Sequence, residues 1–335
     1  PQGIELRIGK YHEMEFTPDI FACVLQYPNA AGNVEDYRAF VEKAHAANCK
    51  VAVAADILSL ALLTPPGEWG ADIVFGTTQR LGTPMFYGGP SAAYFATRDE
   101  YKRNMPGRII GWSKDKYGKL CYRMALQTRE QHIKREKATS NICTAQALLA
   151  TMAGFYAVYH GPEGIRTIAE RIHSIAVFLE KSINRLGYKQ VNAQYFDTLR
   201  FALPDTISAQ QIRTIALSKE VNLRYFKNGD VGMSIDETTD ITAVNVLLSI
   251  FAIAAGRDWE KASDVPMASS ISAEMKRQST YLTHEVFNKY HTETEMMRYI
   301  KRLDRKDISL AHSMISLGSC TMKLNAAAEM LPLSR

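Results

Sequence analysis

The sequence lacks the features that define several specialised classes of protein. Its cysteines include no C-x-x-C pair, which argues against a disulfide framework and against a zinc site. No apolar stretch reaches the roughly 18–20 residues of a membrane helix, and the densest one, residues 246–255, is far shorter. We therefore expect no bound metal, no membrane span and a reducing compartment.

The charges form no block of one sign. Lys and Arg number 40 against 35 Asp and Glu, and they are spread along the chain, so we expect no nucleic-acid partner. There is also no internal repeat and no low-complexity tract. With 335 residues, 46% of them hydrophobic, the chain is long enough for a large core and for more than one domain.

The two ends predict that the chain is an excised piece of a longer protein. It opens at Pro1 without an initiator Met, and residues 4–8 already alternate like a strand. Its other end follows directly on a motif-like run. We expect the bacterial cytoplasm, and the mitochondrial matrix stays an alternative because any leader would lie outside the piece.

The first part of the chain alternates β-rich and helical runs. Strands are predicted at 20–26, 51–55, 71–75 and 91–97, with a helix at 34–47. This alternation predicts a mostly parallel sheet with helices on its faces. Ligands of such sheets bind at the carboxyl ends of the strands, which directs attention to Asp56 and to the residues after Phe75.

Helices and then a smaller α+β pattern follow. Helices are predicted at 128–136, 144–159 and 165–186; after them come strands at 198–202, 221–225 and 231–235 with helices at 209–219 and 242–255. The turn at 228–230 predicts an antiparallel hairpin. We expect a partial large α/β domain over 1–160, a bridging helix with a small α+β domain over 161–256, and a linker with the start of a second half over 257–335.

Asp56 ends an apolar strand, and a polar loop follows the next strand. This loop, residues 75–84, reads FGTTQRLGTP, and YGGP follows at 87–90. An acid after one strand and a glycine-rich return after the next is the layout of pyridoxal-phosphate enzymes, in which the acid pairs with the pyridinium nitrogen and a lysine forms the imine. The alternative is that Asp56 caps the segment that follows it.

Four runs, in order along the chain, resemble the P-protein family of the glycine cleavage system. They read TTQRLG at 77–82, YGGP at 87–90, REKATSNICTAQAL at 135–148 and LGSCTMKLN at 317–325. The resemblance implies a fold-type-I pyridoxal-phosphate-dependent transferase-like large domain, partial here, plus a small α+β domain. In this family two related halves are fused, and only the second carries the cofactor lysine.

The resemblance places Gln79 where the active half has its lysine. Glutamine has no amine nucleophile, and residues 71–90 contain no lysine, so we expect no catalytic residue and no imine in this piece. Asp56, twenty-three residues earlier, is the candidate for contact with the cofactor ring.

Four further residues are candidates for contact with the cofactor of the partner half. By resemblance, Thr139 reaches its phosphate, although the triplet 139–141 also suits a helix cap. Cys320, Thr321 and Lys323 lie in a polar loop that the resemblance places near the same pocket. For Lys323 the alternative is an exposed loop lysine.

The resemblance implies a parent enzyme that decarboxylates glycine through pyridoxal phosphate and passes the aminomethyl group to the lipoyl arm of the H-protein. The expected partners are the lysine-bearing second half and the lipoylated H-protein, in a homodimer of the full protein. The alternatives are a non-catalytic scaffold or regulatory half, and an unrelated cysteine desulfurase-like enzyme, which Gln79 disfavours.

Overall fold

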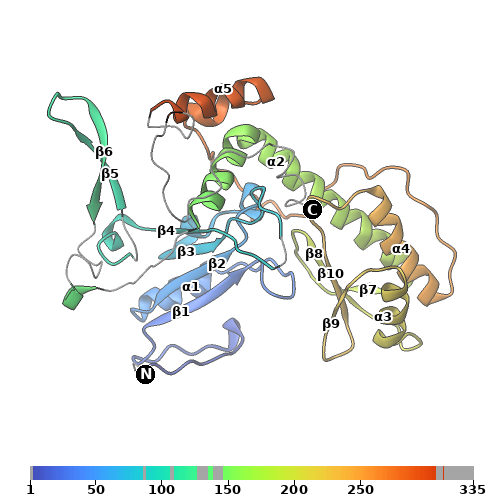
Figure 1. Ribbon diagram of the computed structural model, residues 1–335. Helices are drawn as coiled ribbons and strands as arrows, with labels where there is room; N and C mark the ends of the chain where they lie inside the picture. Colours follow the sequence, from blue (N-terminus) through green and yellow to red (C-terminus); the bar gives the residue numbers. More distant parts are fainter. Residues whose placement is uncertain are drawn as a thin grey trace.

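The computed structural model describes residues 3–85, 88–105, 109–126, 135–138, 146–306 and 312. Thr139, Cys320, Thr321 and Lys323 lie outside the described residues, as does most of the helix predicted at 128–136. The described part contains two four-stranded sheets, a protruding hairpin and one long helix (Figure 1).

The first sheet has the predicted mostly parallel topology. Its order is β1 (Ala22–Tyr27), β2 (Lys50–Ala55), β3 (Ile73–Thr77) and β4 (Ala93–Thr97). The first three strands are parallel and β4 is antiparallel to β3. Because β2 and β3 run in the same direction, the residues that follow them meet at one edge of the sheet.

One face of this sheet packs on helix α1 (Arg38–Ala46). The apolar stripe of the helix is buried against strand β2, whose Val51 and Val53 have no exposed surface. The helix begins four residues later than predicted, because the Val34 amide donates to the Gln194 carbonyl at 2.9 Å instead of entering a helix.

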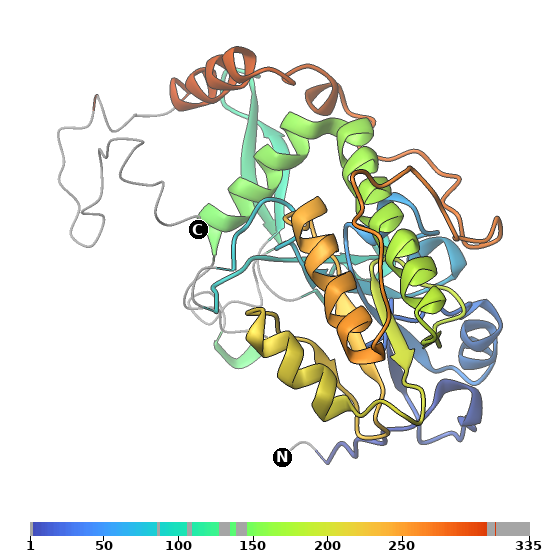
Figure 2. The same ribbon diagram turned by 90° about the vertical axis from the view of Figure 1, so that its right-hand side faces the viewer.

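The long helix α2 (Ala147–Arg185) runs beside both sheets (Figure 2). Two helices were predicted here, and α2 does consist of two helical parts, separated by a kink at Gly161, whose backbone is non-helical, and Pro162. Gly161 has φ 62°, and a Cβ there would lie 2.6 Å from the Phe287 carbonyl oxygen. Proline removes a helical hydrogen bond, and the tight approach of Phe287 requires glycine, so these two residues determine the position of the kink.

The second sheet is antiparallel throughout. Its order is β7 (Lys189–Gln190), β8 (Thr198–Ala202), β10 (Val231–Ser234) and β9 (Arg224–Tyr225). The predicted hairpin is the pair β9 and β10, and β7 was missed because two residues carry too little alternation to predict a strand.

Two helices belong to the second sheet. They are α3 (Ala209–Ser218) and α4 (Ile241–Ala255), which contact each other. Both begin at predictable caps: the Ser208 hydroxyl accepts from the Gln211 amide, and the Asp240 carboxylate accepts from the Ala243 amide. Helix α4 ends at Gly256 in the left-handed conformation.

A hairpin of β5 (Ile109–Lys114) and β6 (Leu120–Leu126) extends away from the first sheet (Figure 1). The sequence did not predict it. The remaining elements are helix α5 (Glu293–Asp304) and short 3-10 helices at Tyr11–Glu13, Ser59–Ala61, Pro66–Trp69, Asp99–Tyr101, Arg135–Lys137 and Glu285–Asn288.

Two segments outside the sheets and helices differ from what the sequence predicts. The strand predicted at 4–8 is wrong: no strand forms there, and Ile4, Leu6 and Ile8 are exposed. Residues 268–270, within the segment expected to begin as a linker, contact α2. There the buried His173 donates through Nδ1 to the Phe196 carbonyl and accepts through Nε2 from the Ser270 amide. This chain segment therefore packs on the helix although it has no core of its own.

Candidate functional site

Asp56 lies where the sequence places it, directly after β2 at the carboxyl edge of the first sheet. Its amide donates to the Tyr27 carbonyl at 3.0 Å, and its Oδ1 accepts from the Leu58 amide at 3.1 Å. The carboxylate thus stabilises the turn that follows. It does not cap the 3-10 helix at Ser59–Ala61, whose N-cap residue is Leu58. Its second oxygen, Oδ2, points to a different partner.

That partner is Arg80, which the sequence analysis missed. Its Nη1 lies 3.3 Å from Asp56 Oδ2 and 2.7 Å from Asp197 Oδ2, and its Nε lies 3.2 Å from Glu237 Oε1. We call these four side chains the Arg80 cluster. Their exposed fractions run from 10% for Asp197 to 29% for Glu237, so the cluster is largely shielded from water.

The Arg80 cluster joins four separate segments of the chain. Arg80 and Asp56 follow β3 and β2 of the first sheet, whereas Asp197 directly precedes β8 and Glu237 follows β10 of the second. The guanidinium also lies over the Phe196 ring, 5.8 Å from its centroid. A single arginine therefore connects the edges of both sheets.

The charges in the cluster do not balance, because three carboxylates share one guanidinium. Burial raises the pKa of Asp56 to about 6, with Asp197 and Glu237 adding to the rise and Arg80 opposing it. Burial works against the charge of Arg80, but the three carboxylates outweigh it and raise the pKa of the guanidinium. Arg80 stays charged, and Asp56 is the group that takes up a proton in mild acid.

Gln79 begins the loop that carries Arg80. Its amide donates to Thr77 Oγ1 at 3.1 Å, and its carbonyl accepts from the Thr83 amide at 3.1 Å. The loop packs closely on α2, since a Cβ at Gly82 would lie 2.5 Å from the Tyr156 ring. Tight packing fixes the backbone of this loop and directs Arg80 towards the carboxylates.

The residues at this edge do not fit a pyridoxal ring. The Asp56 oxygen that would face a pyridinium nitrogen is already paired with Arg80, and Gln79 offers no amine for an imine. The role of Gln79 as a degenerate lysine position and that of Asp56 in cofactor contact stay predictions. A sequence signal for Arg80 existed, since it is the first cation after the strand that follows Asp56.

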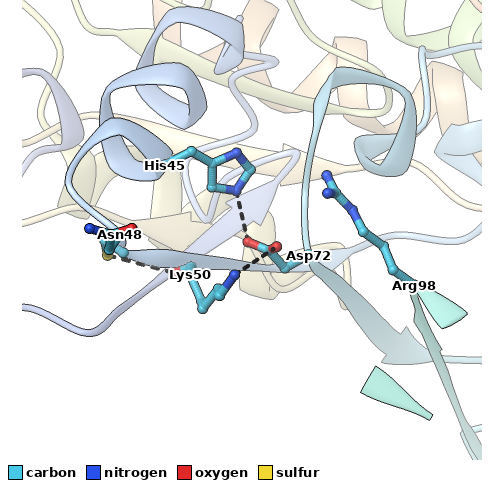
Figure 3. A pocket seen from close by; sticks show the side chains of 6 residues that line it. His45, Asn48, Lys50, Asp72 and Arg98 are labelled. Atoms are coloured by element: carbon cyan, nitrogen blue, oxygen red, sulfur yellow. Dashed lines mark hydrogen bonds and ion pairs between the residues drawn. The ribbon is translucent and has the colours of Figure 1, made fainter. Parts of the chain in front are cut away.

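A cavity of about 270 Å³ lies at the opposite edge of the first sheet (Figure 3). It is lined by His45, Asn48, Cys49, Lys50, Asp72 and Arg98. Asp72, only 2% exposed, has its carboxylate 2.9 Å from His45 Nε2, accepts from the Val51 amide at 2.8 Å and accepts from the Tyr101 hydroxyl at 3.2 Å. Because Asp72 is fully partnered, we interpret it as a structural link between α1, β2 and β3.

Within the described residues, no helix is both long enough and apolar enough to span a bilayer.

Comparison with known proteins identifies the family. A model of the family "Glycine cleavage system P-protein" matches residues 1–251. The chain is 86% identical over 334 residues to glycine dehydrogenase (decarboxylating) of Bacteroides fragilis and 84% identical over 335 residues to that of Bacteroides thetaiotaomicron. Each match extends over 100% of this chain but only 35% of the relative, so the chain spans about a third of the length of these proteins. These matches do not favour the cysteine desulfurase alternative.

Solved structures agree with this result. A crystal structure of glycine decarboxylase (P-protein) of the glycine cleavage system, in inhibitor-bound form, is 31% identical with a TM-score of 0.65, covering 71% of this chain and 55% of that one. A sphingosine-1-phosphate lyase of Burkholderia pseudomallei, 14% identical with a TM-score of 0.52 over 74% of this chain and 54% of that one, shares the fold alone. The architecture is the fold-type-I α/β fold predicted from the sequence. The chain therefore belongs to the glycine cleavage system P-protein family.

Proposed function

We propose that this chain is the non-catalytic, supporting part of a glycine-decarboxylating P-protein. The whole protein would decarboxylate glycine and pass the aminomethyl group to the lipoyl arm of the H-protein, with pyridoxal phosphate supplying the electron sink when bound in the lysine-bearing half. One observation carries the assignment of this chain: Arg80 pairs with Asp56, the predicted ring contact, and stands next to a glutamine instead of a lysine.

The Arg80 cluster supports a scaffolding role in particular. It ties Asp56 of the first sheet to Asp197 and Glu237 beside the second, and so fixes the two sheets relative to one another. A rigid support of this kind helps to position a neighbouring site to within the fraction of an ångström that catalysis needs. The scaffold alternative and the enzymatic parent are in this sense compatible.

The remaining assignments follow from the family. The partners would be the lysine-bearing half and the lipoylated H-protein, in a homodimer of the full protein in the bacterial cytoplasm; the relatives reported above are bacterial. Thr139, Cys320, Thr321 and Lys323 would contact the cofactor held by the partner half. The domain division at residues 160 and 256 likewise belongs to this proposal.

An absorbance titration with pyridoxal phosphate tests the proposal. We expect the full-length protein to develop the visible band of a lysine imine and to release carbon dioxide from glycine when the H-protein is present. This chain alone should develop no stoichiometric band that survives dialysis. Replacing Gln79 by alanine in the full-length protein should leave the band intact.

Two results would contradict the proposal. A stable stoichiometric band in this chain that disappears on Lys323→Ala would make the chain itself a site of imine formation. A full-length protein that forms the imine but neither decarboxylates glycine nor exchanges its carboxyl group would refute the reaction.

A further inference from the structure

The β5–β6 hairpin carries an apolar face that faces solvent. Five large side chains on it have exposed fractions between 41% and 73%: Ile110, Trp112, Leu120, Tyr122 and Met124. The strand register places Ile110 opposite Met124 and Trp112 opposite Tyr122. Since side chains alternate along a strand, all five lie on the same side of the ribbon.

No described residue of this hairpin belongs to the hydrophobic core of the chain. It projects away from the first sheet in Figure 1, and its two strands form a sheet of their own. The Trp112 and Tyr122 rings meet edge to face with centroids 5.8 Å apart, so their principal aromatic contact is with each other. An isolated two-stranded hairpin is marginal in water, and a contiguous apolar patch of this kind marks an interaction surface.

The composition of the patch resembles the centre of a protein interface. Trp, Tyr and Met are enriched in such centres, and aromatic anchors contribute most of the binding energy. The opposite side of the ribbon carries Ser113, Cys121 and Arg123, which form no comparable apolar surface. The partner must therefore contact one defined side of the hairpin.

The charges argue against a second copy of the same hairpin as the partner. Three basic side chains and one acidic side chain lie in or next to the turn: Lys114, Lys116 and Lys119, with Asp115. In a two-fold symmetric contact the same patch meets itself, which would bring the cationic groups of both copies together. The matching surface should be apolar with a carboxylate rim.

We propose that this face of the hairpin docks on the lysine-bearing part of the same polypeptide, which lies outside this chain. The chain spans 35% of its relatives, so about two thirds of the full protein is available to cover the patch. A covalently linked surface is also present at high effective concentration. The inference rests on the proposed function for the identity of that part, and it makes the hairpin the contact through which this chain supports the cofactor-bearing site.

Hydrogen exchange of the full-length protein tests the proposal. The amides of residues 109–126 should exchange at least about tenfold more slowly in the full-length protein than in this chain alone. In the full-length protein the double variant Trp112→Ser with Tyr122→Ser should lose that protection. Ser113→Thr on the opposite side of the same hairpin is the matched control and should keep it.

Three outcomes would overturn the proposal. Equal exchange in the two proteins would show that the rest of the polypeptide does not cover the face. Protection that grows with protein concentration would assign the face to a second copy, and protection that needs added H-protein would assign it to the carrier. Glycine decarboxylation, measured on the same samples, separates the two ideas: an active protein with an unprotected hairpin refutes the docking alone, and an inactive protein with a protected hairpin refutes the reaction alone.

Discussion

Replacing Arg80 by methionine tests the account of the cluster most directly. The change keeps the length of the side chain but leaves Asp56, Asp197 and Glu237 without a cation. Removing one partner of a fully buried ion pair costs about 3–5 kcal/mol. Because these side chains keep 10–29% of their surface exposed, we expect the lower end, about 3 kcal/mol. For a chain of 335 residues, that corresponds to a fall in the melting temperature of about 4 °C.

The loss should depend on pH in a defined direction. The pKa of Asp56 in the folded state, about 6, lies above its ordinary value of 3.8. Protonation of Asp56 therefore stabilises the fold fully below pH 3.8, and this contribution is lost as the pH rises through about 6. Without Arg80 the pKa should rise further, so the deficit should be largest near pH 8 and should shrink towards pH 5 as a proton neutralises Asp56.

Urea unfolding of the wild type and the variant at pH 5 and pH 8 measures this difference. Arg38→Met is the matched control, because Arg38 pairs with Asp36 at 2.6 Å on the surface, with both side chains about half exposed. Such a pair contributes about 1 kcal/mol at most, and the control should change little at either pH. If Arg80→Met costs no more than the control, or costs the same at pH 5 and pH 8, the carboxylates do not depend on Arg80 and the reasoning is wrong.

Three further predictions concern the scaffold. Gly76→Ala should destabilise the chain by about 3 kcal/mol or more in urea unfolding, because a Cβ there would lie 2.3 Å from the Ala55 carbonyl oxygen, and equal stability would show that β2 can move aside. Burial lowers the pKa of His173 below its ordinary 6.5, so the free energy of unfolding should fall as the pH drops below about 6.5. His173→Gln should remove that part of the pH profile of stability, and an unchanged profile would refute a neutral buried ring. Asp240→Ala should cost about 1 kcal/mol through loss of the cap on α4, a cost that Asp240→Asn should largely spare.

The sequence predicted the strands and helices whose own periodicity is strong. The strand at 198–202 was placed to the residue, and α4 was placed to within one residue at its start, where Asp240 caps it. The antiparallel direction of β4 was not predicted, because it depends on the pairing of β4 back on β3. The break predicted between two helices falls within α2 at Gly161, whose backbone is non-helical and which the Phe287 carbonyl approaches.

The candidate site was predicted only in part, for a physical reason. Asp56 could be found because a parallel strand ends there, and strand ends meet at one edge. Asp197 and Glu237 could not be found, since they lie more than a hundred residues away from Asp56 and reach Arg80 only after the two sheets pack together. Arg80 lies within the TTQRLG run at 77–82, but the interpretation of that run rested on Gln79, where the resemblance predicts a lysine in the active half.

Arg80 and Asp56 each provide the counterion that the other needs at the carboxyl edge of the first sheet. A carboxylate at the end of a buried strand with no counterion would be costly, and a guanidinium with no carboxylate in the same place would be equally costly. Because the loop from Gln79 to Gly82 is fixed by its packing on α2, Arg80 reaches Asp56 together with two acids beside the second sheet. The ion pair that Asp56 makes with Arg80 is thus part of the same contact that holds the sheets together. We therefore expect Gln79→Lys alone to create no ring site, because Asp56, the predicted ring contact, is already paired with Arg80.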